Sequence, residues 1–264
     1  MKFSKYLFAV PIAVALLTGC QGEEEKTDQT SGEAGVAQEE TTEGKQSMDT
    51  TDDANRTLKG IETDDSAIAD LVEEARNIES YQAMVDLEAL VDDESSQTLD
   101  ADVKYKEGTP PSLHLKSEGE DRTISKDGET YYNNGDDWVD ISESIEIEQL
   151  FHVTYKNAVI AFSDIKDEMK LTEEENQLIY TFEGESTEIF EVFESLFAAE
   201  FSAIDTSNPN NEVEVVIDKE NSRIKSIQYE ATGEDAEGRY ELSGEVEFKS
   251  FNDIGAIQLP ESVD

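Results

Sequence analysis

The stretch TDDSAIADLVEEARNIESYQAMVDLEALV (63–91) changes its periodicity in the middle, and this change sets the class of fold. Up to residue 80 the apolar residues recur at spacings of three and four, which predicts an amphipathic helix over 63–80. Asp64 or Asp65 can cap the start of this helix. Over 80–91 apolar and polar residues alternate, which predicts a strand with one buried face.

The same alternation recurs through the rest of the chain. RTISKDGETYYNN (122–134) is typical of a hairpin that turns at Asp127 and Gly128, and 168–184 of two strands around an acidic turn. Short strands joined by tight turns pair antiparallel, so we expect a meandering sheet. Further strands are expected at 98–106, 112–119, 137–141, 212–218, 223–232 and 239–251.

Two later segments have helical spacing. The segment 144–165 carries a stripe of apolar residues and is predicted to be a helix, with a strand as the alternative that Val153, Val159 and Ile160 leave open. The segment 186–201 follows a serine or threonine cap and is predicted to be a helix with a strongly apolar face. Because each of the three helices is apolar along one stripe, we expect them to lie across the inner face of the sheet.

The chain begins with the features of an export signal. Lys2 and Lys5 precede an apolar run over 6–17 that is too short to span a bilayer comfortably. Small residues follow it, and basic, apolar and small residues in this order are typical of a secretory signal. Cys20 is the only cysteine of the chain, so it has no internal disulfide partner. A soluble secreted protein with an incidental cysteine is the alternative interpretation.

Leu17, Thr18, Gly19 and Cys20 resemble the lipobox of bacterial lipoproteins. The resemblance implies cleavage of a signal peptide over 1–19, a diacylglyceryl group on Cys20, and anchoring on the extracytoplasmic face of the cell membrane. Two acyl chains give a stable anchor where a single chain gives only marginal binding.

The segment 20–62 is rich in Glu, Asp, Thr, Gln, Ser and Gly, with few apolar residues. Such a composition cannot offset the entropy of ordering, so we expect a disordered tether that is lipidated at its first residue. A tether of this length reaches roughly 35 Å on average. The alternative is an acidic tail that binds a partner. The segment 63–264 is long enough for one domain with a sizeable core.

Acidic residues dominate the chain, with 64 Asp and Glu against 20 Lys and Arg and a formal net charge of −44. This balance argues against nucleic acid and anionic membrane surfaces as direct partners. It is compatible with adaptation to a salty medium or with loose cation capture. The acidic segments 205–212 and 133–137 lack the spacing of an EF-hand loop, so no metal site is predicted.

The sequence contains none of the motifs of a common catalytic site. There is no Gly-x-Ser-x-Gly, no phosphate loop and no His-Glu-x-x-His. His114 lies between Leu113 and Leu115, so strand alternation turns it outward, and His152 has no motif around it. We therefore expect no enzyme, no catalytic residue and no cofactor.

Aromatic residues are the positive signal for function. They either fill the core or line an apolar cavity that holds a hydrophobic ligand. The candidate ligand-lining residues are Tyr81, Trp138, Phe151, Tyr155, Phe162, Phe190, Phe193, Phe197 and Phe201.

A family resemblance rests on three stretches: Ser80 and Tyr81 after the first helix, SKDGETYYNNGDDWVDI (125–141) and FNDIGAIQLPESV (251–263). With them, 66–264 resembles uncharacterised lipoproteins of Gram-positive bacteria that are related to the LolA and LppX-type lipoprotein carriers. The resemblance implies an α+β fold in which a strongly curved antiparallel sheet forms a half-open barrel, with about three helices on its concave face. It also implies a hydrophobic, lipid-like ligand between sheet and helices, as in a carrier or a sensor. The alternative is a protein–protein interaction module in envelope signalling or assembly, without a small ligand.

Overall fold

The computed structural model describes residues 58–61, 63–92, 94–199, 201, 208–234, 238–260 and 263. All of them belong to one compact unit, 51–264. The predicted signal peptide, the lipobox with Cys20, and all but the last few residues of the predicted tether lie outside the described residues. None of the helices in the described ranges has the length and apolar character that a membrane crossing requires.

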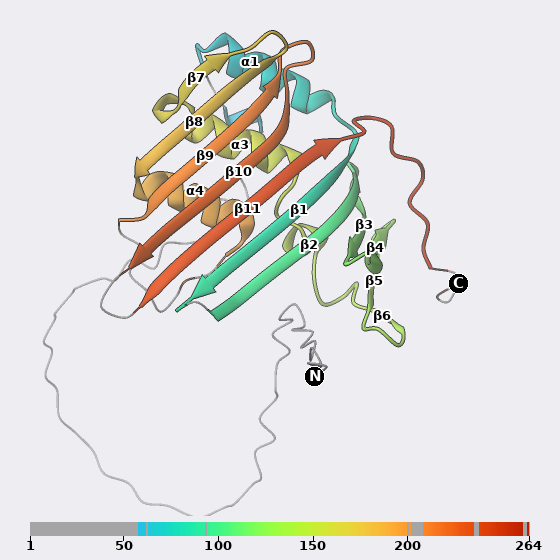
Figure 1. Ribbon diagram of the computed structural model, residues 1–264. Coiled ribbons are helices and arrows are strands. Elements are labelled where there is room, and N and C mark those ends of the chain that lie inside the picture. Colours follow the sequence, from blue (N-terminus) through green and yellow to red (C-terminus); the bar gives the residue numbers. More distant parts are fainter. Residues whose placement is uncertain are drawn as a thin grey trace, which may run out of the picture. The chain divides into compact units, whose positions relative to one another are not determined.

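The described strands form one eleven-stranded antiparallel sheet in the order β6-β5-β4-β3-β2-β1-β11-β10-β9-β8-β7. The first and last strands in that order do not pair with each other, so the sheet is not closed. In Figure 1 the strands β3–β6 turn away from the plane of the long strands β1, β2 and β8–β11. The strands are β1 (Ser80–Val91), β2 (Glu94–Lys106), β3 (Ser112–Ser117), β4 (Glu120–Lys126), β5 (Glu129–Asn133), β6 (Trp138–Asp140), β7 (Lys170–Glu173), β8 (Gln177–Glu185), β9 (Asn210–Asp218), β10 (Arg223–Glu234) and β11 (Arg239–Lys249).

Three helices lie on one side of this sheet, as Figure 1 shows: α1 (Ser66–Asn77), α3 (Tyr155–Ile165) and α4 (Thr187–Phe197). Each helix is capped by the residue that precedes it: Asp65, Thr154 and Ser186, respectively. The side-chain oxygen of each cap accepts a backbone N–H from the first turn of its helix. Two 3₁₀ turns, η2 (Leu58–Gly60) and η3 (Lys166–Glu168), and the short helix α2 (Ile147–Leu150) complete the helical structure of the described residues. The expected α+β architecture, with helices on one face of an open antiparallel sheet, is confirmed.

The core lies between the inner face of the sheet and the helices. Along β1 the inner residues Tyr81, Ala83 and Val85 are buried, whereas Met84 and Asp86 between them are exposed. The predicted period of two is therefore confirmed, and so is the hairpin turn, where Asp127 and Gly128 both have positive φ angles of 54° and 89°.

Two helix predictions are wrong in their extent. The segment predicted as one helix over 144–165 is broken over 151–154, where buried and half-buried residues alternate and the backbone is extended. The extended break buries both Phe151 and Val153, and Thr154 then caps a new helix. The helix predicted over 186–201 ends at Phe197, because Ala198 adopts a left-handed conformation with φ of 50°.

Candidate functional site

A band of aromatic rings fills the space between the inner face of the sheet and the helices, and we call it the aromatic seam. Eight of the nine residues predicted to line a ligand site belong to it, and each of its rings is at most 5% exposed. Aromatic rings of this kind bury large apolar areas. The seam consists of Tyr81, Tyr105, Phe151, Tyr155, Phe162, Tyr180, Phe190, Phe193, Phe197, Phe201, Tyr229, Tyr240 and Phe248.

Under α3 the rings of the sheet and the helix touch directly. Tyr81 stacks on Tyr105 with ring centroids 5.3 Å apart. Tyr155 meets Phe248 edge to face at 5.1 Å, and Phe162 meets Tyr180 in the same way at 4.9 Å. Both distances lie in the favourable range for aromatic pairs, so this half of the seam is packed rather than hollow.

Under α4 the contacts are equally close. Phe193 stacks on Tyr229 of β10 at 4.1 Å, and Phe190 lies edge to face against Tyr240 of β11 at 5.4 Å. Phe201 lies beyond the end of the helix, and its ring contacts Tyr240 at 5.3 Å. The ring of Phe197 occupies the space above Gly244 of β11, where a Cβ atom would overlap it. The absence of a side chain on Gly244 thus lets α4 approach the sheet.

Tyrosine hydroxyls fasten the seam to the backbone. The hydroxyl of Tyr81 accepts the N–H of Tyr155 at 3.0 Å, and the hydroxyl of Tyr155 accepts the N–H of Ile224 at 3.0 Å. The hydroxyl of Tyr229 donates to Oδ1 of the buried Asn211 at 2.8 Å. Burial raises the pKa of Tyr81, Tyr155 and Tyr229 above the ordinary tyrosine value. These buried hydroxyls are thus hydrogen-bonded, as buried polar groups usually are.

Trp138 is the candidate that does not join the seam. Trp138 lies on the edge strand β6 and pairs with Asn133 of β5. The next residue, Val139, pairs with Tyr132 of β5, which faces the inner side of the sheet. Strand alternation therefore places Trp138 on the face opposite the helices, where it is half-buried.

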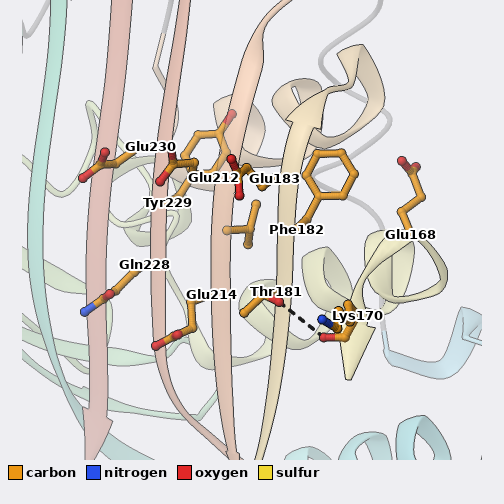
Figure 2. A pocket seen from close by; sticks show the side chains of 11 residues that line it. Glu168, Lys170, Thr181, Phe182, Glu183, Glu212, Glu214, Gln228, Tyr229 and Glu230 are labelled. Carbon is orange, nitrogen blue, oxygen red and sulfur yellow. Dashed lines mark hydrogen bonds between the residues drawn. The ribbon is translucent and has the colours of Figure 1, made fainter. Parts of the chain in front are cut away.

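The outer face of the sheet carries an open groove of about 750 Å³ across β8, β9 and β10. Figure 2 shows the side chains of Glu183, Glu212 and Glu230 in one row across these strands. We call the acidic part of this face the outer acidic face. Like charges directly opposite each other on neighbouring strands destabilise a sheet. No group of three or more potential ligand side chains among the described residues could hold a metal ion.

Glu245, Asp86 and Asp100 continue the outer acidic face onto β11, β1 and β2, where each lies opposite the next in register. In the same cross-strand row Gln228 lies between Glu214 and Glu245. The face presents carboxylates over six neighbouring strands, so it suits a positively charged surface rather than an anionic one.

A second hollow of about 500 Å³ opens on the inner side of the sheet, near its β6 end, and we call it the rim pocket. Its walls come from three segments: the loop between β2 and β3, the turn between β4 and β5, and the segment that leads into α2. The lining residues are Gly108, Thr109, Pro110, Pro111, Ser125, Gly128, Thr130, Ser142, Ile145, Glu146 and Ile147. Sequence reasoning missed this pocket, because its walls meet only through tertiary contacts.

The two histidines are engaged structurally. Nε2 of His114 lies 2.7 Å from Oδ1 of Asp121 on the outer face of the sheet. Burial alone would raise the pKa of Asp121, but hydrogen bonds from His114 and Lys116 outweigh it and lower that pKa. His152 lies in the break between α2 and α3, and partial burial lowers its pKa. Neither arrangement contains the nucleophile and base of a catalytic pair.

Comparison with known proteins gives structural likenesses but no sequence match. No family model matches the chain, and no curated protein matches it. A crystal structure of a LolA superfamily protein from Nitrosomonas europaea is similar, with 11% sequence identity, a TM-score of 0.23, and coverage of 74% of this chain and 96% of that one. A likeness at this identity and score supports no statement about ligand, partner or anchoring.

Proposed function

We propose that this chain is a membrane-anchored extracytoplasmic lipoprotein whose domain binds a hydrophobic, lipid-like molecule between sheet and helices, as a carrier or a sensor. The anchor rests on the lipobox-like residues Leu17–Cys20, as the sequence indicates. A chain with Cys20→Ser should lose incorporation of labelled palmitate and should leave the membrane fraction. Retention of the label on that variant would contradict lipidation at this residue.

The observation that carries the ligand proposal is the aromatic seam. It is buried throughout, and its rings come from helices on one side and from β2, β1, β11, β10 and β8 on the other. Because rings fill it, a ligand enters only when α3 and α4 move away from the sheet. The acyl chain then contacts the rings in place of the ring–ring contacts that are lost. The apolar surface of the rings therefore stays buried. Each Å² of apolar surface that the ligand removes from water contributes about 25 cal/mol.

The attachment of α4 suits such a movement. Its start is held by Asn211, whose side-chain amide donates to the carbonyl oxygens of Ser186 at 2.9 Å and Pro209 at 3.1 Å. Further along, Phe193 and Phe197 rest on the sheet through ring contacts, which can separate without breaking a hydrogen bond. We therefore place the pivot of this movement at the first turn of α4.

Quenching by brominated acyl lipids tests the location of the ligand. Trp138 is the only tryptophan of the chain and lies on the outer face, so bromine atoms bound in the seam should leave its fluorescence unchanged. A chain with Trp138→Phe and Phe162→Trp carries its only indole in the seam, and the same lipids should quench it strongly. Circular dichroism of both chains controls for folding. Equal quenching of the two chains, or none in either, would contradict a site in the seam.

The outer acidic face favours a second candidate function, that of a module for a protein partner in envelope signalling or assembly. Its carboxylates would steer a basic partner at low salt, with an on-rate that falls as ionic strength rises. Crosslinking in cells should then yield one stoichiometric protein partner. Charge reversal at Glu212 and Glu230 should abolish that crosslink if this second function is correct.

A further inference from the structure

The rim pocket shares its floor with the aromatic seam. Ser125 of β4 lies opposite Leu113 of β3, and Leu113 lies opposite Tyr105 of the seam. All three therefore point to the same inner face of the sheet. Ile147 lines the pocket and is also part of the hydrophobic core. A molecule seated in the rim pocket would thus touch the apolar core at Ile147.

Two hydroxyl groups of the pocket are deeply buried. The hydroxyls of Thr130 and Ser125 lie 2.9 Å apart, and these residues are only 4% and 2% exposed. Two hydroxyls bring two hydrogens, and their mutual bond uses one. Within the described contacts the other hydrogen has no acceptor. The pair therefore offers a buried donor to a ligand oxygen.

The neighbouring Ser142 has no such capacity. Its hydroxyl accepts the N–H of Thr130 at 2.8 Å and donates to the carboxylate of Asp140 at 2.5 Å. The bond from Thr130 holds Ser142 against β5. The donor left for a ligand is therefore the one shared by Ser125 and Thr130.

The charge of the pocket selects among head groups. Among the described residues that line it, Glu146 is the one charged residue, and none is a lysine or arginine. A phosphate in the pocket would lose water, gain no counter-charge and face a carboxylate, which is unfavourable. The apolar part of the walls comes from Pro110, Pro111 and Ile145. A volume of about 500 Å³ is within the usual range for a small-ligand site.

We propose that the rim pocket holds the uncharged, oxygen-bearing head group of an acyl lipid, whose chain continues past Ile147 into the seam. The spare hydroxyl hydrogen of Ser125 and Thr130 donates to an ester or hydroxyl oxygen of that head group. The inference rests on the proposed function, and it adds that neutral lipids are selected over anionic ones.

Photocrosslinking with two matched probes tests this selection. The full lipidated chain, in phosphatidylcholine vesicles, is exposed to diacylglycerol or phosphatidic acid carrying the same diazirine-labelled acyl chains. The two probes differ only in the phosphate. Diacylglycerol should label the chain at least tenfold more than phosphatidic acid, and the labelled peptides should contain 108–111 or 142–147.

Three variants separate the pocket from its surroundings. Ser125→Ala should reduce labelling by diacylglycerol about fivefold, the usual effect of one lost hydrogen bond. Ser117→Ala is the matched control, because Ser117 is on the same inner face but outside the pocket, and it should change nothing. Glu146→Lys should raise labelling by phosphatidic acid. Circular dichroism of each variant confirms that it folds.

The outcomes distinguish a failure of the head-group inference from a failure of the proposed function. Equal labelling by both probes, located in the seam, would overturn the head-group inference and leave the proposed function standing. No labelling by either probe would overturn both. An unchanged signal in a folded Ser125→Ala chain would overturn the role of its hydroxyl, whereas the expected preference with the expected peptides supports the inference.

Discussion

Replacement of Gly244 by alanine should destabilise the domain, although alanine is otherwise the better residue within a strand. Gly244 faces the helices from the middle of β11, opposite Tyr229 on β10 and Leu87 on β1. A Cβ atom built on it would overlap three carbon atoms of the Phe197 ring. The added methyl group must therefore push α4 outward or force Phe197 from its rotamer.

The magnitude follows from two opposing effects. Overpacking of a dense core costs about 1–3 kcal/mol. Alanine recovers about 0.5–1 kcal/mol relative to glycine, because glycine loses more backbone entropy on folding. Overlap with three ring atoms places the cost in the upper part of its range, about 2–3 kcal/mol. The net loss should then be about 1–2.5 kcal/mol, or a fall of several degrees in Tm for a domain of this size. Because the clash involves one ring, Phe197→Leu should relieve it. The double variant should then be more stable than the sum of the two single effects by about 1 kcal/mol.

Urea unfolding followed by far-UV circular dichroism measures the free energy of unfolding of the unmodified chain, the two single variants and the double variant. Gly255→Ala is the matched control, since nothing lies within 4 Å of a Cβ atom there. It should leave the midpoint nearly unchanged. Additive effects of Gly244→Ala and Phe197→Leu, or a neutral Gly244→Ala, would refute the close approach of α4 to the sheet.

Four further predictions concern charge and the buried hydroxyls. Glu212→Gln removes the like-charge repulsion with Glu183 and Glu230 on the neighbouring strands and should stabilise the domain by about 0.5 kcal/mol in dilute buffer. The gain in stability should be smaller in 1 M sodium chloride. An equal gain at both salt concentrations would contradict the repulsion. Gln228→Glu should have the opposite effect in the same denaturation experiment. Burial raises the pKa of Tyr155 and Tyr229 above the ordinary 10.0, so the unfolded chain loses these protons at lower pH than the folded chain does. Their contribution to the free energy of unfolding should therefore be constant below pH 10 and should fall as the pH rises above 10. A free energy of unfolding that stays constant to higher pH would argue against their burial. Tyr81→Phe leaves the buried N–H of Tyr155 without its acceptor and should cost about 1–3 kcal/mol in thermal unfolding, whereas a neutral result would mean that another acceptor replaces it.

Local patterns were enough to predict most of the elements. The alternation around Tyr81 and the dipeptide Asp127-Gly128 each act over a few residues, and the structure has the strand and the turn that they predict. The break over 151–154 was not predictable in this way. Phe151 and Val153 fit an apolar stripe at helical spacing and an extended segment equally well, and only packing decides between the two.

Features that depend on contacts between distant parts of the chain could not be predicted from the sequence. The face on which Trp138 lies depends on the register of a three-residue edge strand, which carries too short a pattern to reveal it. The fit of Phe197 over Gly244 joins residues that are far apart in the sequence, and so does the rim pocket. Whether aromatic residues surround a cavity or fill it depends on tertiary packing, which here brings their rings into contact.

Native mass spectrometry of the chain released gently from its membrane tests the central proposal most directly. The account predicts a population heavier than the covalently lipidated protein by the mass of a hydrophobic molecule, which organic solvent removes and which added diacylglycerol restores. A single mass that corresponds to the protein and its covalent lipid alone, unchanged after incubation with acyl lipids, would contradict it.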